Sequence, residues 1–93
     1  MSAMPLHTDQ MDMAIMNLEQ LKLGLRIRDA RKFLGYSQKG FAAACGLDRS
    51  YLGGVERGER NVTFGVLCTI CTGLTCDIAA VTKGIPHLTE ATT

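Results

Sequence analysis

The sequence predicts an all-α fold of five helices, with an N-terminal helix longer than a small domain needs. Between Ser37 and Gly58 the apolar residues form two short helical stripes interrupted at one glycine, Gly46. Before and after this pair, further apolar residues recur at the spacings of three and four that are typical of helices. The chain has 93 residues and therefore makes a single domain, near the lower size at which a core supports itself.

The first helix is expected to begin at Thr8 or Asp9, because either side chain can accept from the free backbone N–H groups of a first turn. Residues 1–8 show little periodicity and are predicted to be a disordered tail. Residues 9–84 are the predicted domain. Residues 85–93 are polar and are predicted to be a flexible C-terminal tail.

This first helix either runs unbroken to Phe33 or bends near Gly24. Its first half carries an apolar stripe of Met11, Ile15, Leu18, Leu21 and Leu25. Packing on the chain's own core and pairing with another subunit both account for this stripe. Its second half is expected to pack beneath the following helices through Leu25, Ile27, Ala30, Phe33 and Leu34.

The next two helices are expected to meet at a tight bend at Gly46, where the backbone needs a positive φ. Ser37 and Asp48 can cap them. So short a bend makes the second helix cross the first steeply and present its outer face to a partner. That face is predicted to carry Arg49, Ser50, Gly53, Gly54 and Arg57. Arginine beside small polar residues suits phosphates and guanine edges, because a guanidinium donates two parallel hydrogen bonds.

A polar loop then leads to Thr63, which is expected to cap a fourth helix. The apolar residues of that helix are Phe64, Leu67, Cys68, Ile70 and Cys71. Asp77 is expected to cap a short fifth helix. Residues 74–78 would also suit a strand, because their apolar side chains alternate, but the capping aspartate favours the helix.

The positive charge is concentrated around the paired helices. The formal net charge is only +1, but the segment from Arg26 to Arg60 carries eight basic residues against four acidic ones. The remainder carries two basic residues and five acidic ones. Local potential governs attraction to phosphates, so this distribution favours a nucleic-acid partner for the central segment.

The four cysteines, Cys45, Cys68, Cys71 and Cys76, are interpreted as small core residues in a reducing compartment. The spacing of Cys68 and Cys71 would also allow a thiol or metal sensor. A zinc site needs a second ligand pair, however, so we predict no metal and no cofactor. We also predict no enzyme, because no nucleophile has a spaced base. No apolar run reaches membrane-spanning length, so we expect no membrane partner and a cytoplasmic protein.

The paired helices resemble the helix-turn-helix of the lambda repressor and Cro family, also called the xenobiotic response element (XRE) family. Gln38 opens the first helix, and Ala42 and Gly46 occupy the small-residue and turn positions. The segment YLGGVERG is similar to the family's Tyr-Leu-Ser-x-Ile-Glu-Arg-Gly ending. The similarity extends from about Leu25 to Gly84. It implies a lambda-repressor-like domain that binds double-stranded DNA as a homodimer.

The resemblance also implies roles for individual residues. The implied DNA-binding residues are Ser37, Gln38, Lys39, Asp48, Arg49, Ser50, Tyr51, Gly54, Arg57, Arg60 and Asn61. Among them, Gln38 would bind a phosphate and Arg49 a base edge. Arg31 and Glu56 match the family's structural salt bridge. Gly53 and Gly54 depart from the family, which usually has side chains there.

The implied function is regulation of transcription, most simply as a repressor that binds a palindromic operator as a homodimer. Two alternatives within the family remain open at this point. One is a controller protein of a restriction-modification operon. The other is an antitoxin that binds a toxin through the N-terminal helix or the C-terminal tail and autoregulates its operon.

Overall fold

Five helices make up the part of the chain described by the computed structural model, which covers residues 4–86 and the side chains of residues 18–86. The helices are α1 (Met4–Phe33), α2 (Gln38–Cys45), α3 (Arg49–Glu56), α4 (Phe64–Leu74) and α5 (Ile78–Thr82). No strand occurs within residues 4–86. The predicted all-α class is therefore confirmed, and the strand alternative for residues 74–78 is wrong.

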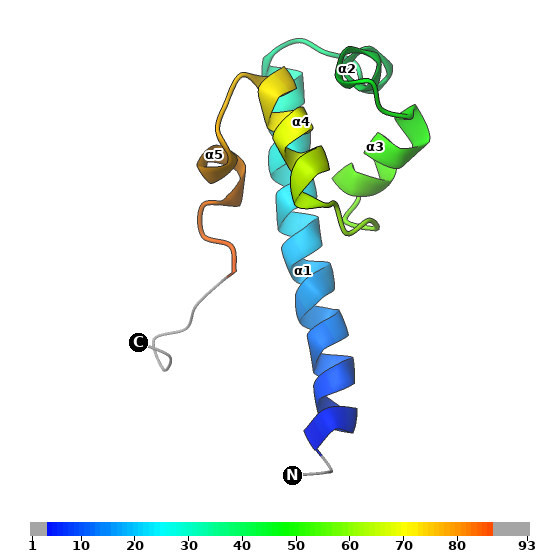
Figure 1. Cartoon of the computed structure of the whole chain (residues 1–93), viewed down its shortest axis with the longest axis vertical. Coiled ribbons are helices and arrows are strands. Elements are labelled where there is room, and N and C mark those ends of the chain that lie inside the picture. The colour runs from blue at the N-terminus through cyan, green and yellow to red at the C-terminus, as the bar shows by residue number, and fades with distance from the viewer. Residues whose placement is uncertain (1–3, 87–93) are drawn as a thin grey trace.

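Helix α1 is continuous for 30 residues and passes through Gly24 without a break. It begins at Met4, earlier than the expected start at Thr8 or Asp9. Figure 1 shows its N-terminal half extending beyond the other four helices. The predicted disordered tail of residues 1–8 overlaps α1, which is helical from Met4, whereas the tail predicted for residues 85–93 stays a prediction; residues 1–3 and 87–93 lie outside the described part.

The helix starts follow the capping residues of the sequence. Ser37 Oγ accepts from Gly40 N at 2.9 Å, and Asp48 Oδ2 accepts from Tyr51 N at 3.2 Å. The same arrangement opens the last two helices, at Thr63 and Asp77. Each such cap stabilises its helix by about 0.5 to 2 kcal/mol.

The core takes side chains from all five helices. Its buried members are Ile27, Phe41, Ala42, Leu52, Val55, Leu67, Ile70, Cys71, Leu74 and Val81. Helix α1 packs against α3, α4 and α5, and α2 packs against α3 and α4. Figure 1 places α2 and α3 on one side of α1 and α5 on the other. Each fully buried aliphatic or aromatic side chain contributes about 1.5 to 3 kcal/mol.

The side of α1 that faces the core differs from the predicted one. Ile27 is fully buried and Ala30 packs against the core, as expected. The prediction is wrong for Leu25, Phe33 and Leu34, which are exposed. The buried side is instead set by Gly24, Ile27 and Arg31, at helical spacings of three and four.

Gly24 is the residue that brings α1 and α3 together. A Cβ atom there would overlap the carbonyl oxygen of Val55 and lie 2.6 Å from that of Glu56. Both are backbone atoms at the end of α3, so they cannot turn away as a side chain could. Of the two alternatives for Gly24, the unbroken helix is thus the one observed, and the glycine is a point of close approach between two helices that fixes where α3 sits.

Not every cysteine belongs to the core. Cys71 is buried in it, and Cys45 and Cys76 pack against it. Cys68 is half-buried and lies outside the cluster, so its predicted core position is wrong. All four thiols are free.

Candidate nucleic-acid interface

The bend between α2 and α3 turns the first residues of α3 outward. Gly46 ends α2 with a φ of +69°, in the left-handed region that glycine enters without steric cost. Asp48 then caps α3. Arg49 and Ser50 occupy the first turn of α3 and are both exposed. An exposed arginine at this place can reach a partner without any rearrangement of the chain.

A buried ion pair holds the other end of α3. Arg31 Nε donates to Glu56 Oε2 at 2.7 Å, and Arg31 Nη2 donates to Glu56 Oε1 at 3.0 Å. Only 7% and 3% of the two side chains are exposed. Arg31 Nη1 also donates to the carbonyl oxygen of Tyr36 at 2.8 Å. The structure thus forms the bridge that the family resemblance implies, and it links α1 to α3.

Gln38 joins this pair from α2. Its Nε2 donates to Glu56 Oε1 at 3.1 Å, so Arg31, Glu56 and Gln38 tie three helices at one point. Below, these three side chains are called the Arg31–Glu56–Gln38 network. The sequence gives no signal of the Gln38 contact, because the partners lie 18 residues apart. An amide nitrogen carries two hydrogens, so one remains to donate to a phosphate.

Gly53 and Gly54 do not lie exposed on the outer face of α3, contrary to the prediction. Both are buried. A Cβ at Gly53 would lie 3.0 Å from Arg57 Nη1 and 3.3 Å from Gln38 Oε1, and one at Gly54 would lie 2.9 Å from Arg60 Cγ. The two glycines therefore make room for long polar side chains that lie across α3.

Two further arginines, Arg57 and Arg60, follow α3. Arg57 Nη2 pairs with Glu59 Oε1 at 3.2 Å, and both side chains are 60% exposed. The guanidinium carbon of Arg60 lies 6.0 Å from the centroid of the Tyr51 ring. This cation–π contact gives the half-buried Tyr51 a role in positioning Arg60. Asn61 follows and is exposed.

Most of the residues predicted to bind DNA lie together at the start of α2, along α3 and in the loop that follows. The exposed ones are Ser37, Lys39, Asp48, Arg49, Ser50, Arg57, Arg60 and Asn61. Gln38 and Tyr51 are half-buried, and Gly54 is buried.

Two further basic residues, Arg28 and Lys32, adjoin this region and were not among the predicted site residues. They line a groove of about 540 Å³ between α1 and α3, which Gln38 and Arg57 also line. Their spacing of four on one helix places them on one face. That spacing, together with their charge, is the signal that could have identified them.

Burial disfavours the thiolate form of two of the cysteines, Cys45 and Cys71. Burial raises the pKa of the Cys71 thiol from 9.0 to about 11, and the neighbouring Cys76 adds to the shift. Burial also raises the pKa of Cys45. No group of three or more metal-ligating side chains gathers among the described residues. Within the same part of the chain, none of the helices is long and apolar enough to cross a membrane.

Comparison with known proteins agrees with this geometry. The model of the helix-turn-helix family HTH_3 matches residues 27–81. The chain is 34% identical over 67 residues to the control protein C.SmaI of Serratia marcescens, a match that covers 72% of this chain and 79% of C.SmaI. It is 57% identical over 37 residues to the uncharacterized HTH-type transcriptional regulator YazB of Bacillus subtilis. That match covers 40% of this chain and spans about half, 54%, of YazB.

The fold is also similar to a solved structure, that of the restriction-modification controller protein C.AhdI from Aeromonas hydrophila. The two share a TM-score of 0.67 and 41% sequence identity. The similarity covers 69% of this chain and 97% of C.AhdI.

Proposed function

Because the chain belongs to the helix-turn-helix family HTH_3 and is thereby a DNA-binding regulator of transcription, we propose that it binds a two-fold symmetric operator as a homodimer, with α3 in the major groove. The observation that carries this proposal is the pose of α3. Its first turn is open at Arg49 and Ser50, while its last turn is fixed by the Arg31–Glu56–Gln38 network. A helix held in this way can enter a groove in one orientation.

The predicted site residues divide into two roles. Arg49 and Ser50 meet base edges, with Arg49 on guanine. The others meet phosphates from the start of α2 and from the loop after α3. This second group is Ser37, Gln38, Lys39, Tyr51, Arg57, Arg60 and Asn61. Asp48 caps α3, and Gly54 leaves room for the Arg60 side chain to lie across α3.

Helix α1 offers a surface for pairing two copies. Leu18, Leu21 and Leu25 lie on one face with 52%, 41% and 43% of their surface exposed. The acidic residues Asp9 and Asp12 lie in the first third of α1, and basic residues lie toward its end, so an antiparallel pair would bring opposite charges together. Analytical ultracentrifugation measures this self-association: Leu25→Lys should weaken it, whereas Leu34→Lys, at a leucine of nearly the same exposure (44%) beyond this face, should not.

A second candidate function is favoured by two of the matches. C.SmaI is named a control protein and C.AhdI a restriction-modification controller protein, so control of such an operon stands beside simple repression of a promoter. None of the matches described above is named a toxin or an antitoxin, and a toxin partner receives no support. A regulator of transcription acts where the genome is, so we place the protein in the cytoplasm, and we assign it no catalytic residue.

Selection of bound DNA from a random pool at stated salt tests the proposal, because a palindromic consensus would establish both specificity and two-fold symmetry. Arg49→Ala should relax one position of the consensus by about 1 to 3 kcal/mol. Arg60→Ala should instead weaken binding to all sequences and lower the salt slope by about one. If Arg49→Ala weakened specific and random DNA equally, its assignment to a base edge would be wrong.

A further inference from the structure

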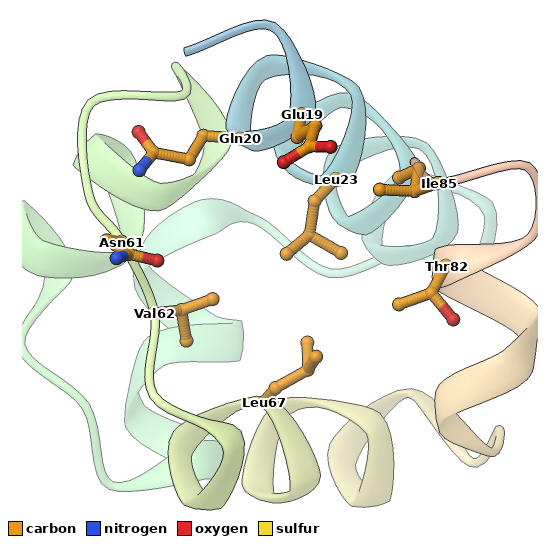
Figure 2. Close-up of a pocket in the computed structure, with 8 residues that line it drawn as sticks. All are labelled: Glu19, Gln20, Leu23, Asn61, Val62, Leu67, Thr82 and Ile85. Atoms are coloured by element: carbon orange, nitrogen blue, oxygen red, sulfur yellow. The ribbon is translucent and has the colours of Figure 1, made fainter. Parts of the chain in front are cut away.

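A second pocket lies beside the DNA-binding loop, between α1, the loop before α4, α4 and the segment after α5. Its volume is about 180 Å³. Figure 2 shows Leu23 of α1 and Leu67 of α4 pointing toward each other across it. Val62 enters from the loop, and Thr82 and Ile85 lie on the opposite side. The interior is therefore apolar.

The polar residues of this pocket are all able to accept hydrogen bonds. Glu19 and Gln20 come from α1, and Asn61 comes from the loop (Figure 2). Among the described side chains, Glu19 forms no ion pair. Two cations on the α5 side are outside the lining: Arg26, which donates to the carbonyl oxygen of Val81 at 3.3 Å, and the exposed Lys83 at the end of α5. The pocket thus combines an apolar interior with a carboxylate that forms no ion pair among the described side chains and with the side-chain oxygen of Asn61.

We propose that this pocket binds a small primary amine with a compact apolar body of about eight to ten non-hydrogen atoms. The size follows from the volume, since a cavity of about 150 Å³ holds benzene and this one is slightly larger and open. The positive charge of the ligand follows from the oxygen acceptors on the rim of the pocket. An ammonium group carries a positive charge and donates hydrogen bonds, so it suits the Glu19 carboxylate, with the side-chain oxygen of Asn61 as a second acceptor on the rim.

Such a ligand would also act on DNA binding, and this second step rests on the function proposed above. Val62 and Asn61 line the pocket, and Arg60 directly precedes them. Arg60 lies over Gly54 and Tyr51 at the DNA-binding face. A ligand packed on Val62 restricts the loop and so removes part of the entropy cost of fixing Arg60 on a phosphate. Binding of the amine and binding of DNA should strengthen each other by about two- to fivefold.

Titration of the full chain with three matched probes tests the pocket without DNA. The probes are 2-phenylethylamine, 2-phenylethanol and phenylacetate at neutral pH, and the readout is the NMR shift of the Leu23, Val62 and Leu67 methyl groups. The amine should bind about three- to fivefold more tightly than the alcohol. Phenylacetate should bind most weakly. Absent shifts, equal affinity for amine and alcohol, or a preference for phenylacetate would each overturn the proposal.

Variants localise the effect. Glu19→Gln should remove the preference for the amine over the alcohol, whereas Asp29→Asn, at an exposed carboxylate of α1 outside the pocket, should keep it. Val62→Phe fills the pocket from the loop and should weaken both probes by about tenfold or more, with unaltered thermal unfolding as the check on its fold. Leu88→Ser should change nothing. Tighter amine binding by Leu88→Ser would mean that the chain's own C-terminal segment occupies the pocket, which would overturn the proposal.

The coupling is measured separately, as the affinity for selected DNA with and without saturating 2-phenylethylamine. A gain of about two- to fivefold is expected in the original chain and none in Val62→Phe. No gain, or a loss, would overturn the coupling and leave the pocket standing. Failure to bind DNA at all would overturn the proposed function and not the pocket, because the methyl shifts do not depend on DNA.

Discussion

Replacing Glu56 by alanine should remove about 3 to 5 kcal/mol of folding free energy. Its carboxylate accepts from Arg31 Nε, Arg31 Nη2 and Gln38 Nε2, at 2.7, 3.0 and 3.1 Å. Without it, a guanidinium with a side chain only 7% exposed keeps its charge and retains, among the described atoms, the Tyr36 carbonyl as partner. That uncompensated charge, more than the lost hydrogen bonds, determines how much folding free energy the substitution removes.

This loss is large for a domain of this length. At about 0.05 to 0.15 kcal/mol per residue, the whole chain is stable by roughly 5 to 14 kcal/mol. At about 4 to 8 °C per kcal/mol, the thermal midpoint of Glu56→Ala should fall by at least about 12 °C. Urea and thermal unfolding followed by far-UV circular dichroism measure both quantities.

Two controls separate burial from charge alone. Glu59→Ala removes the partner of an exposed arginine, Arg57, and should change stability by only about 0 to 1 kcal/mol. The double change Arg31→Met with Glu56→Leu replaces the buried pair by apolar volume and should recover most of the stability. It should not recover DNA affinity, because Gln38 loses its acceptor. If Glu56→Ala lost no more than Glu59→Ala, the reasoning about the buried pair would be refuted.

Three further predictions concern the rest of the fold. Gly24→Ala should lower the free energy of unfolding by about 1 to 3 kcal/mol, because the added methyl group meets the α3 backbone. Gly65→Ala is the control, because a Cβ there has nothing within 4 Å, and it should stabilise the fold. Equal effects of the two changes in urea unfolding would contradict the close approach at Gly24. Thr63→Ala should cost about 1 kcal/mol by the same measurement, and an unchanged midpoint would argue against the cap. Burial raises the pKa of the Cys71 thiol from 9.0 to about 11, so the folded state keeps a proton that the unfolded state loses. The free energy of unfolding should therefore fall from pH 9 to 11 more steeply in the original chain than in Cys71→Val. Equal pH dependence of stability in the two proteins would contradict the raised pKa of Cys71.

Local features of the fold could be predicted from the sequence. The capping roles of Ser37, Asp48, Thr63 and Asp77 and the positive φ of Gly46 depend on residues within one turn, so the sequence pattern determines them. The all-α class follows from periodicity in the same way.

Features that depend on contacts between distant segments could not be predicted. A glycine inside a helix is compatible with a bend and also with the close approach of another helix. The sequence does not distinguish these two roles for Gly24, because the answer depends on where α3 packs. The apolar Phe33 satisfies the helical pattern but lies past the part of α1 that the core covers, and it is 89% exposed. Gly53 and Gly54 are buried by the long side chains of Gln38, Arg57 and Arg60, and the sequence does not specify the conformations of those side chains.

The same reasoning applies to the candidate site. Arg49 and Ser50 are exposed as expected, because capping by Asp48 fixes which residues form the first turn of α3. The hydrogen bond from Gln38 to Glu56 needs α2 and α3 to cross at one particular angle, and no short-range pattern encodes that angle.

The Arg31–Glu56–Gln38 network has a consequence for the kinetics of complex formation. Three helices that are already locked at one shared carboxylate leave little conformational search for the moment of encounter. Association should then proceed at a rate set by diffusion and long-range attraction between the basic surface and the duplex, and differences between operators should appear mainly in how long each complex lasts.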